Sequence, residues 1–186
     1  MAATRTRADA VRNYGRVLAA ASAVLAEKGP EAGIPEIAAR AGVGKGTVYR
    51  CFETKEHLVA AVLADRLRAW TADIAAAAER PDAWEAFTEL LADSAERQAQ
   101  DCSFAQGLGH DSATPELLEA KAAMYAELDR LMARAQEQGR MRAGATSQDL
   151  RVLFAGLAHA LRADGVRDPV VWRRYAHMLA GAFRAA

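Results

Sequence analysis

The stretch from Gly33 to Lys55, GIPEIAARAGVGKGTVYRCFETK, constrains the fold of this chain more than any other part of it. Its apolar residues fall at helical spacings in two short runs, and three glycines crowd the connection between the runs. Glycine permits a sharp turn and a close approach of two helices. The stretch therefore predicts two short helices joined by a tight turn, with a third helix starting directly after them.

The second of these short helices has two unlike faces. Val48 and Phe52, four residues apart, form an apolar face. The other face carries two cations, a hydroxyl and a phenol, which belong to Lys45, Thr47, Tyr49 and Arg50. Such groups suit the phosphate oxygens and base edges of a DNA groove. We interpret the stretch as a DNA-binding helix-turn-helix, with a place in the packed core as the alternative for Tyr49.

The rest of the chain has the pattern of an all-α protein. Aromatic residues make up 6% of the 186 residues, five prolines are present, and helical periodicity runs nearly from end to end. Thr54 caps a helix that continues to about Glu79, which is too long for a three-helix head. From Pro81 onward the periodicity predicts a helical bundle. Residues 101–115 contain two glycines and a proline, which predicts a short or irregular helix and then a loop.

The charge distribution agrees with a DNA-binding N-terminal part. The formal net charge of the chain is zero, but residues 1–60 hold nine Lys and Arg against six Asp and Glu. We expect residues 1–8 to form a mobile basic arm, in which Arg5 and Arg7 follow the phosphate backbone or enter a minor groove. A solvated tail without function is the alternative. Phosphate neutralisation is assigned to this arm and to Lys45, Arg50 and Lys55.

The remaining reactive residues form no pattern that supports catalysis or metal binding. Cys51 and Cys102 have neither metal-ligand nor redox spacing, which favours a reducing cytoplasm. Cys51 is interpreted as a small apolar filler, with a redox switch as the alternative. Four histidines and two unpaired cysteines supply no nucleophile–base pair and no metal-ligand set, so we predict no catalytic residues, no metal and no cofactor.

One apolar segment near the start of the chain has some features of a secretion signal. Residues 17–26 follow an arginine-containing start and superficially resemble a signal peptide, but their apolar residues continue one helical face that begins at Tyr14. No segment approaches the roughly 20 apolar residues that span a membrane. The sequence therefore predicts a cytoplasmic protein.

The pattern IA-x-x-AGV-x-x-GT-x-Y-x-x-F-x-x-KE-x-L resembles the DNA-binding domain of the TetR (tetracycline-repressor-like) family. This chain meets it at Ile37, Ala38, Ala41, Gly42, Val43, Gly46, Thr47, Tyr49, Phe52, Lys55, Glu56 and Leu58. The AEKG of residues 26–29 is similar to the end of that family's first helix. Gly33 and Gly44 depart from the family, which often has Thr and Ser there. Phosphate contacts at these two positions are therefore left to main-chain N–H groups.

The resemblance implies a layout for the whole chain. An N-terminal three-helix head would be joined by a long fourth helix to a C-terminal bundle, with about nine helices in all. Residues 1–55 would be the arm and DNA-binding domain, and residues 56–186 the effector-binding and dimerisation domain. The DNA contacts would come from Lys45, Gly46, Thr47, Tyr49, Arg50, Lys55, Arg5 and Arg7.

The family also implies a small-molecule pocket in the bundle and a dimer interface on the last two helices. Chemistry and position select Trp70, Trp84, Phe87, Phe104, His110, Met124, Tyr125 and Leu128 as pocket candidates. The alternative is plain core, or an exposed loop in the case of His110. Interface candidates are Leu150, Leu153, Phe154, Leu157, Leu161, Val171, Tyr175, Met178 and Leu179. Burial within the monomer is the alternative for these stripes.

The function that the resemblance implies is a homodimeric transcriptional repressor. It would bind a pseudo-palindromic double-stranded DNA operator and leave it when a small-molecule effector binds the bundle. One alternative is a helix-turn-helix protein that a protein partner regulates, or that has no effector. The other is a helical enzyme, for which the sequence supplies no catalytic set.

Overall fold

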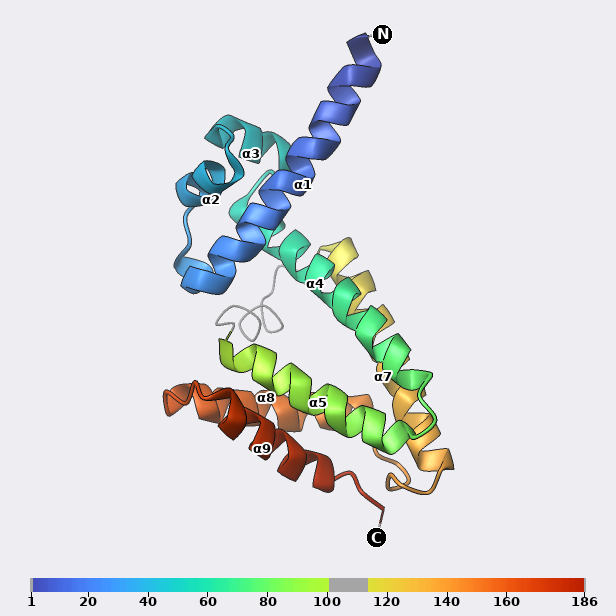
Figure 1. Ribbon diagram of the computed structural model, residues 1–186. Helices are drawn as coiled ribbons and strands as arrows, with labels where there is room; N and C mark the ends of the chain where they lie inside the picture. The colour runs from blue at the N-terminus through green and yellow to red at the C-terminus, as the bar shows by residue number, and fades with distance from the viewer. Residues whose placement is uncertain (1, 101–113, 186) are drawn as a thin grey trace. The chain divides into compact units, whose positions relative to one another are not determined.

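The computed structural model describes residues 2–100 and 114–185, without the side chains of residues 2–8 and 30. These residues form eight α-helices and one 3-10 turn, and the prediction of an all-α fold is confirmed (Figure 1). In chain order the elements are α1 (Ala2–Lys28), η1 (Gly29–Glu31), α2 (Ile34–Ala41), α3 (Lys45–Cys51), α4 (Lys55–Ala78), α5 (Ala83–Gln100), α7 (Pro115–Glu137), α8 (Ser147–Ala163) and α9 (Pro169–Gly181). The helix or loop predicted for residues 101–115 lies almost wholly outside the described residues.

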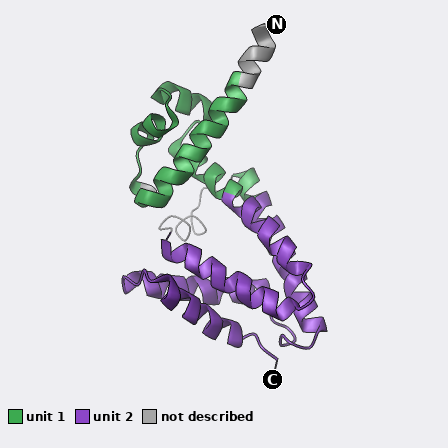
Figure 2. Ribbon diagram, in the orientation of Figure 1, with its two compact units in different colours: residues 1–65, 102–118 green, residues 66–101, 119–186 purple. Residues whose placement is uncertain are grey.

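The chain divides into two compact units (Figure 2). The first comprises residues 1–65 and 102–118, and the second comprises residues 66–101 and 119–186. The division falls inside α4, whereas the predicted domain boundary lies where α4 begins. Helix α4 therefore contributes residues to both units. Of the helices that the structure describes, none is both long and apolar enough to cross a membrane.

The first helix is longer than the sequence predicts. Residues 1–8 are expected to form a mobile arm ahead of a helix starting near residue 10, but α1 begins at Ala2. This expectation is corrected because residues 2–8 contain only Ala, Thr and Arg, with no glycine or proline to interrupt a helix. The backbone of Arg5 and Arg7 is consequently helical.

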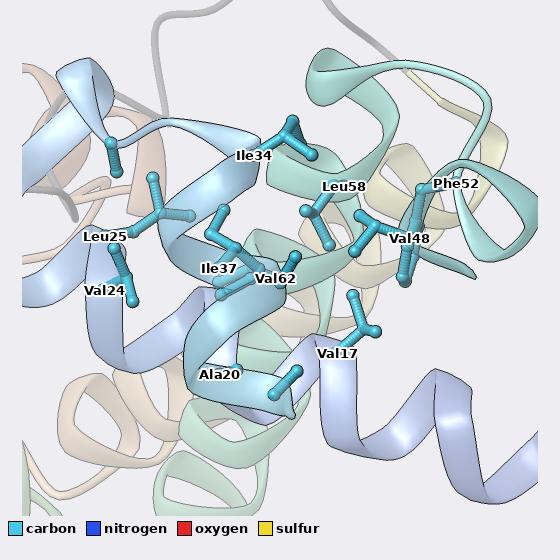
Figure 3. Packing of buried hydrophobic residues seen from close by; sticks show 14 of the residues in the cluster. Val17, Ala20, Val24, Leu25, Ile34, Ile37, Val48, Phe52, Leu58 and Val62 are labelled. Carbon is cyan, nitrogen blue, oxygen red and sulfur yellow. The ribbon is translucent and has the colours of Figure 1, made fainter. Parts of the chain in front are cut away.

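A single hydrophobic core holds α1, α2, α3 and the start of α4 together (Figure 3). Val17 from α1, Ile37 from α2 and Val48 from α3 are each almost completely buried in it. Leu58 and Val62 join it from α4, and the ring of Tyr14 lies 4.8 Å from that of Phe52. Helices as short as α2 and α3 are marginal on their own, so this shared core is what makes them fold.

The ends of α2 are set by glycines at both sides. Gly33 is the extended N-cap residue, and its N–H donates to the Glu36 carboxylate at 3.1 Å. Because glycine has no side chain, this is only half of a capping box. Gly42 ends the helix in the left-handed region, with φ at 63°, where an L side chain would be strained. The sharp turn predicted between the short helices is therefore present at Gly42.

Two exposed ion pairs join the end of α1 to α2. The Arg40 guanidinium donates to both carboxylate oxygens of Glu27, at 2.7 and 3.0 Å. Lys28 pairs with Glu36, and this hydrogen bond, together with that from Gly33, lowers the pKa of the Glu36 carboxyl. Exposed pairs of this kind contribute little to stability. They do neutralise two cations of the N-terminal part, Lys28 and Arg40, whose partners the sequence alone does not reveal.

In the second unit, α5 packs along α9. The buried rings of Phe87 and Phe183 lie 5.9 Å apart at their centroids. Arg173 of α9 donates to Asp93 at 2.9 Å and to Glu96 at 3.0 Å. These contacts show that α9 presents one face to its own chain.

Helix α9 is also tied to the preceding turn and to α8. The indole of Trp172 is buried and donates to the Val166 carbonyl at 2.9 Å. The Arg162 guanidinium carbon lies over this indole, 5.1 Å from the centroid of the ring. The same guanidinium donates to the buried Gln98 amide oxygen of α5 at 2.9 Å. One arginine thus joins α5, α8 and α9.

The second half of α4 is tied to α5 and α7 by arginines. Arg97 of α5 pairs with Asp73 at 3.0 Å, and Arg130 of α7 pairs with Glu79 at 2.7 Å. The Arg130 hydrogen bond lowers the pKa of Glu79. The last turns of α4 are therefore attached to the bundle by side chains as well as by the chain itself.

We predict that Ile37→Ala destabilises the first unit by about 2–5 kcal/mol, because it removes a fully buried side chain from the core that α1, α2 and α3 share. Native-state amide hydrogen exchange of α1–α3 would measure the loss. Val11→Ala is the matched control, since Val11 is exposed on α1, and it should change exchange by less than about 0.5 kcal/mol. Equal effects of the two variants would contradict the assigned core.

Candidate nucleic-acid interface

Helix α3 buries Val48 in the core and packs the half-buried Cys51 against it, as the apolar role predicted for Cys51 requires, while most of its other residues are exposed. Val48 is 0% exposed, whereas Tyr49 is 52% exposed. Lys45, Gly46 and Arg50 are exposed and Thr47 is half-buried. Tyr49 therefore does not belong to the packed core. The polar face that the sequence predicts for this helix is open to a ligand.

The turn before α3 is held by a residue whose role the sequence did not reveal. The Arg16 guanidinium of α1 donates to the Ala41 carbonyl at 2.7 Å and lies within 3.4 Å of the Gly42 carbonyl. A cation at these carbonyls complements the negative end of α2. A Cβ on Gly42 would come within 2.9 Å of this guanidinium. Sequence reasoning counted Arg16 only as part of the basic N-terminal segment.

The start of α3 has two glycines with different roles. Gly44 is the extended N-cap residue, and its carbonyl accepts from the N–H groups of Thr47 and Val48. Gly46 is the second residue of the helix, where glycine is a poorer helix former than alanine. A Cβ at Gly46 would meet no protein atom within 4 Å. Nothing in the packing of the described residues therefore requires glycine at position 46.

Thr47 and Arg50 form a hydrogen bond along α3. An Nη of Arg50 donates to Oγ1 of Thr47 at 2.9 Å. In the described part of the chain, neither Arg50 nor Lys45 has a carboxylate partner within ion-pair distance. The face of α3 consequently combines unneutralised cations with oriented hydrogen-bonding groups.

The start of α4 lies next to α3 in the chain and adds a second set of donors. The hydroxyl of Thr54 accepts from the His57 N–H at 3.1 Å, as an N-cap does. Lys55 is half-buried at the first position of the helix. The pKa of Glu56 is lowered, mainly by hydrogen bonds from its own N–H and from Thr54. The positive end of a helix beside a lysine suits a phosphate group.

Two short helices at a glycine turn, the second of them exposing cations, a hydroxyl and a phenol, define a helix-turn-helix DNA-binding protein. The profile of a family described as "Bacterial regulatory proteins, tetR family" matches residues 17–62. No protein with a curated description matches the sequence significantly.

Solved structures resemble the chain over almost its whole length. The TetR transcription regulatory protein from Mycobacterium vanbaalenii is 31% identical, with a TM-score of 0.64, and the match covers 97% of this chain and 99% of that one. A TetR transcriptional regulator from Streptomyces coelicolor is 24% identical, with a TM-score of 0.67 over 93% of this chain and 99% of that one. FadR from Bacillus subtilis, solved in complex with stearoyl-CoA, is 20% identical, with a TM-score of 0.67 over 90% and 97%.

The chain belongs to the TetR family of bacterial regulatory proteins, as its sequence predicts. It is a DNA-binding transcriptional regulator with the all-α fold of that family.

The structure distributes the predicted pocket residues over three helices. Trp70 lies on α4 and is half-buried. On α5, Trp84 and Phe87 are buried, with ring centroids 5.8 Å apart. Helix α7 carries the buried Met124 and Leu128 and the half-buried Tyr125, whose pKa burial raises. Phe104 and His110 lie outside the described residues.

The predicted interface residues differ in how far their own chain buries them. Leu150 and Leu161 are buried in their own chain. Leu153 and Met178 are exposed, and five more are half-buried: Phe154, Leu157, Val171, Tyr175 and Leu179. Sequence reasoning missed Val152 and Val170, which are also exposed. Apolar spacing alone did not separate the inner face of α8 and α9 from the outer face.

We predict that Gly46→Ala stabilises the fold by up to about 1 kcal/mol, because alanine is the better helix former and its Cβ meets no protein atom. The same change should weaken DNA binding by about 1–3 kcal/mol, since the extra methyl group would lie between α3 and the duplex. Thermal unfolding and fluorescence anisotropy with a labelled duplex measure the two effects.

Gly15→Ala on α1 is the matched control, because a Cβ at Gly15 also meets nothing within 4 Å. It should stabilise the protein similarly and leave DNA affinity unchanged. Unchanged affinity of Gly46→Ala would show that the backbone at Gly46 does not approach DNA closely.

Proposed function

We propose that the chain is a cytoplasmic, homodimeric transcriptional repressor, which binds a pseudo-palindromic operator and is released from it by a small-molecule effector. The observation that carries the proposal is the exposed polar face of α3, held outward by the burial of Val48. Family membership supports operator binding. Repression, dimerisation and the effector are the proposed steps beyond it.

Each DNA-facing residue has a role in this proposal. Lys45 and Lys55 neutralise phosphates, and Arg5 and Arg7 extend this contact along the backbone from the start of α1. Tyr49, exposed on α3, contacts DNA with its ring and hydroxyl. Gly46 lets the helix backbone approach the duplex. Thr47 lies on the same helix and takes part, together with Tyr49, in the choice of sequence.

Apolar side chains exposed on α8 and α9 support dimerisation. Val152 is 55% exposed and Leu153 is 42% exposed on α8, and Val170 at 73% and Met178 at 66% follow on α9. Soluble monomers rarely leave such groups of apolar side chains in water. A second copy that covers them with the same two helices would form a two-fold interface. The two copies of α3 would then contact half-sites about 34–36 Å apart, or a multiple of that spacing.

The aromatic and thioether residues of α4, α5 and α7 support an effector site in the second unit. Trp84, Met124 and Leu128 offer apolar surface, and Tyr125 offers a hydroxyl. Like any tyrosine phenol, Tyr125 keeps its proton at neutral pH, and burial, which raises its pKa, acts in the same direction, so its hydroxyl can donate a hydrogen bond. The same fold in FadR from Bacillus subtilis was solved with stearoyl-CoA bound. An effector would act by favouring a conformation with weaker operator affinity.

We predict that Leu153→Glu with Met178→Glu converts the dimer to a monomer, because two-fold pairing would bury four carboxylates against apolar surface. Sedimentation velocity measures the mass, and operator affinity should fall with it. Leu118→Glu is the matched control, because Leu118 is 52% exposed on α7, outside this surface. A double variant that stays dimeric would contradict the assigned interface.

We predict that some compound in a metabolite screen releases the operator and that Tyr125→Phe requires about 2–12 times more of it, the usual effect of losing one hydrogen bond. Operator affinity without the compound should not change. Tyr175→Phe on α9, which keeps the ring of a predicted interface residue, is the control, and its release relative to its own operator affinity should follow that of the wild type. Release of Tyr125→Phe at the wild-type concentration would place Tyr125 outside the site, and no release by any compound would favour a regulator without an effector.

A further inference from the structure

The hydrogen bond between Arg50 and Thr47 determines where the Arg50 guanidinium lies on α3. Its length is 2.9 Å, and it joins residues three apart, which lie on the same face of a helix. Arg50 is in the last turn of α3. The bond draws its guanidinium back by one turn, toward the part of the helix that begins with Lys45 and Gly46.

That direction changes what Arg50 can contact. In helix-turn-helix proteins the residues near the start of the second helix contact base edges, while phosphate contacts mainly fix register and orientation. The sequence assigned Arg50 to phosphate neutralisation because of its charge. Held by Thr47, the guanidinium is displaced instead toward the region from which bases are read.

The hydrogen bond leaves enough donors for base recognition. A guanidinium has five N–H groups, and Thr47 accepts only one of them. Two parallel N–H groups suffice for the O6 and N7 acceptors of guanine, the commonest specific contact of arginine in the major groove. No carboxylate of the described residues pairs with Arg50 and competes for these donors. Thr47, which accepts through its oxygen, keeps its own hydroxyl hydrogen for donation.

Holding the arginine in advance also favours specificity. A long side chain that is already ordered loses less rotamer freedom when it binds. Thr47 is half-buried, so its hydroxyl is a more fixed acceptor than a fully exposed side chain would be.

We propose that Arg50 reads one guanine in each operator half-site and that Thr47 is the positioning residue for its guanidinium. This inference rests on the proposed function, because it assumes that the protein selects an operator. It assigns to Arg50 sequence discrimination rather than general affinity for phosphate.

The test is selection of bound duplexes from a random DNA pool by the full-length protein and four variants. The wild type should select sites with a guanine at one position of each half-site. Arg50→Lys keeps the charge but lacks the planar pair of donors, and it should lose about 5- to 150-fold of the discrimination at that position. Thr47→Val keeps the shape but lacks the hydroxyl, and it should relax the same position to a smaller extent.

Two further variants separate positioning from direct contact. Thr47→Ser retains the hydroxyl and should keep the wild-type preference. The double variant of Arg50→Lys with Thr47→Val should be no less selective at the guanine than Arg50→Lys alone, because the two residues act as one unit. Thermal unfolding of each variant should stay close to that of the wild type, since Arg50 is exposed and the half-buried Thr47 is replaced only by side chains of similar size.

Three results would overturn the inference. Equal loss of affinity for all sequences in Arg50→Lys or Arg50→Ala would make Arg50 a phosphate contact. Relaxation of a different base pair by Thr47→Val would make Thr47 a direct base contact. An unchanged preference in Thr47→Val would remove its positioning role. In all three the wild type still selects a site. A wild-type protein that selects no sequence would instead overturn operator binding itself, and the inference with it.

Discussion

The burial of Val48 is the interaction on which the DNA-binding surface depends. Helix α3 is seven residues long and makes too few internal hydrogen bonds to be stable in water by itself. Its contact with the core that α1, α2 and the start of α4 share both creates the helix and fixes its rotation (Figure 3). With Val48 inward, Tyr49 and Arg50 are necessarily outward. Fold and function are therefore set by the same apolar side chain.

Net charge gives little information about this protein, whereas the placement of ion pairs gives much. Glu27 and Glu36 neutralise Arg40 and Lys28, and Asp9 pairs with Arg12, all on α1 and α2. In the described part of the chain the cations of α3 have no such partners. A chain with equal numbers of acidic and basic residues can thus present a cationic face to DNA. The net charge does not reveal this arrangement, because the acidic residues that pair with cations lie on other helices.

Local sequence was sufficient where the structure depends on local interactions. Thr54 and Pro81 correctly marked the ends of α4, and the glycine turn placed α2 and α3.

Local sequence was insufficient where the interacting residues are distant in the chain. The Arg16 guanidinium donates to the carbonyl of Ala41, which is 25 residues further along the chain, and no rule of sequence spacing relates the two residues. Val152 and Leu153 face outward beside the buried Leu150, a distinction that depends on the helices covering α8 rather than on its own pattern. The predicted start of the first helix near residue 10 was wrong because an irregular segment was inferred from polarity, although alanine and arginine favour a helix.

In the proposed function, regulation by an effector would act through α4, because this helix contributes residues to both units. It contains no glycine or proline, the usual causes of sharp kinks, from Lys55 to Ala78. Thr54 caps its first turn, while Arg97 and Arg130 hold Asp73 and Glu79 near its other end. A continuous helix transmits a displacement of one end to the other instead of absorbing it at a hinge. The proposed effector would then have to bind with different affinities to two positions of α4. About 5.5 kcal/mol is needed to shift such an equilibrium from 1:99 to 99:1.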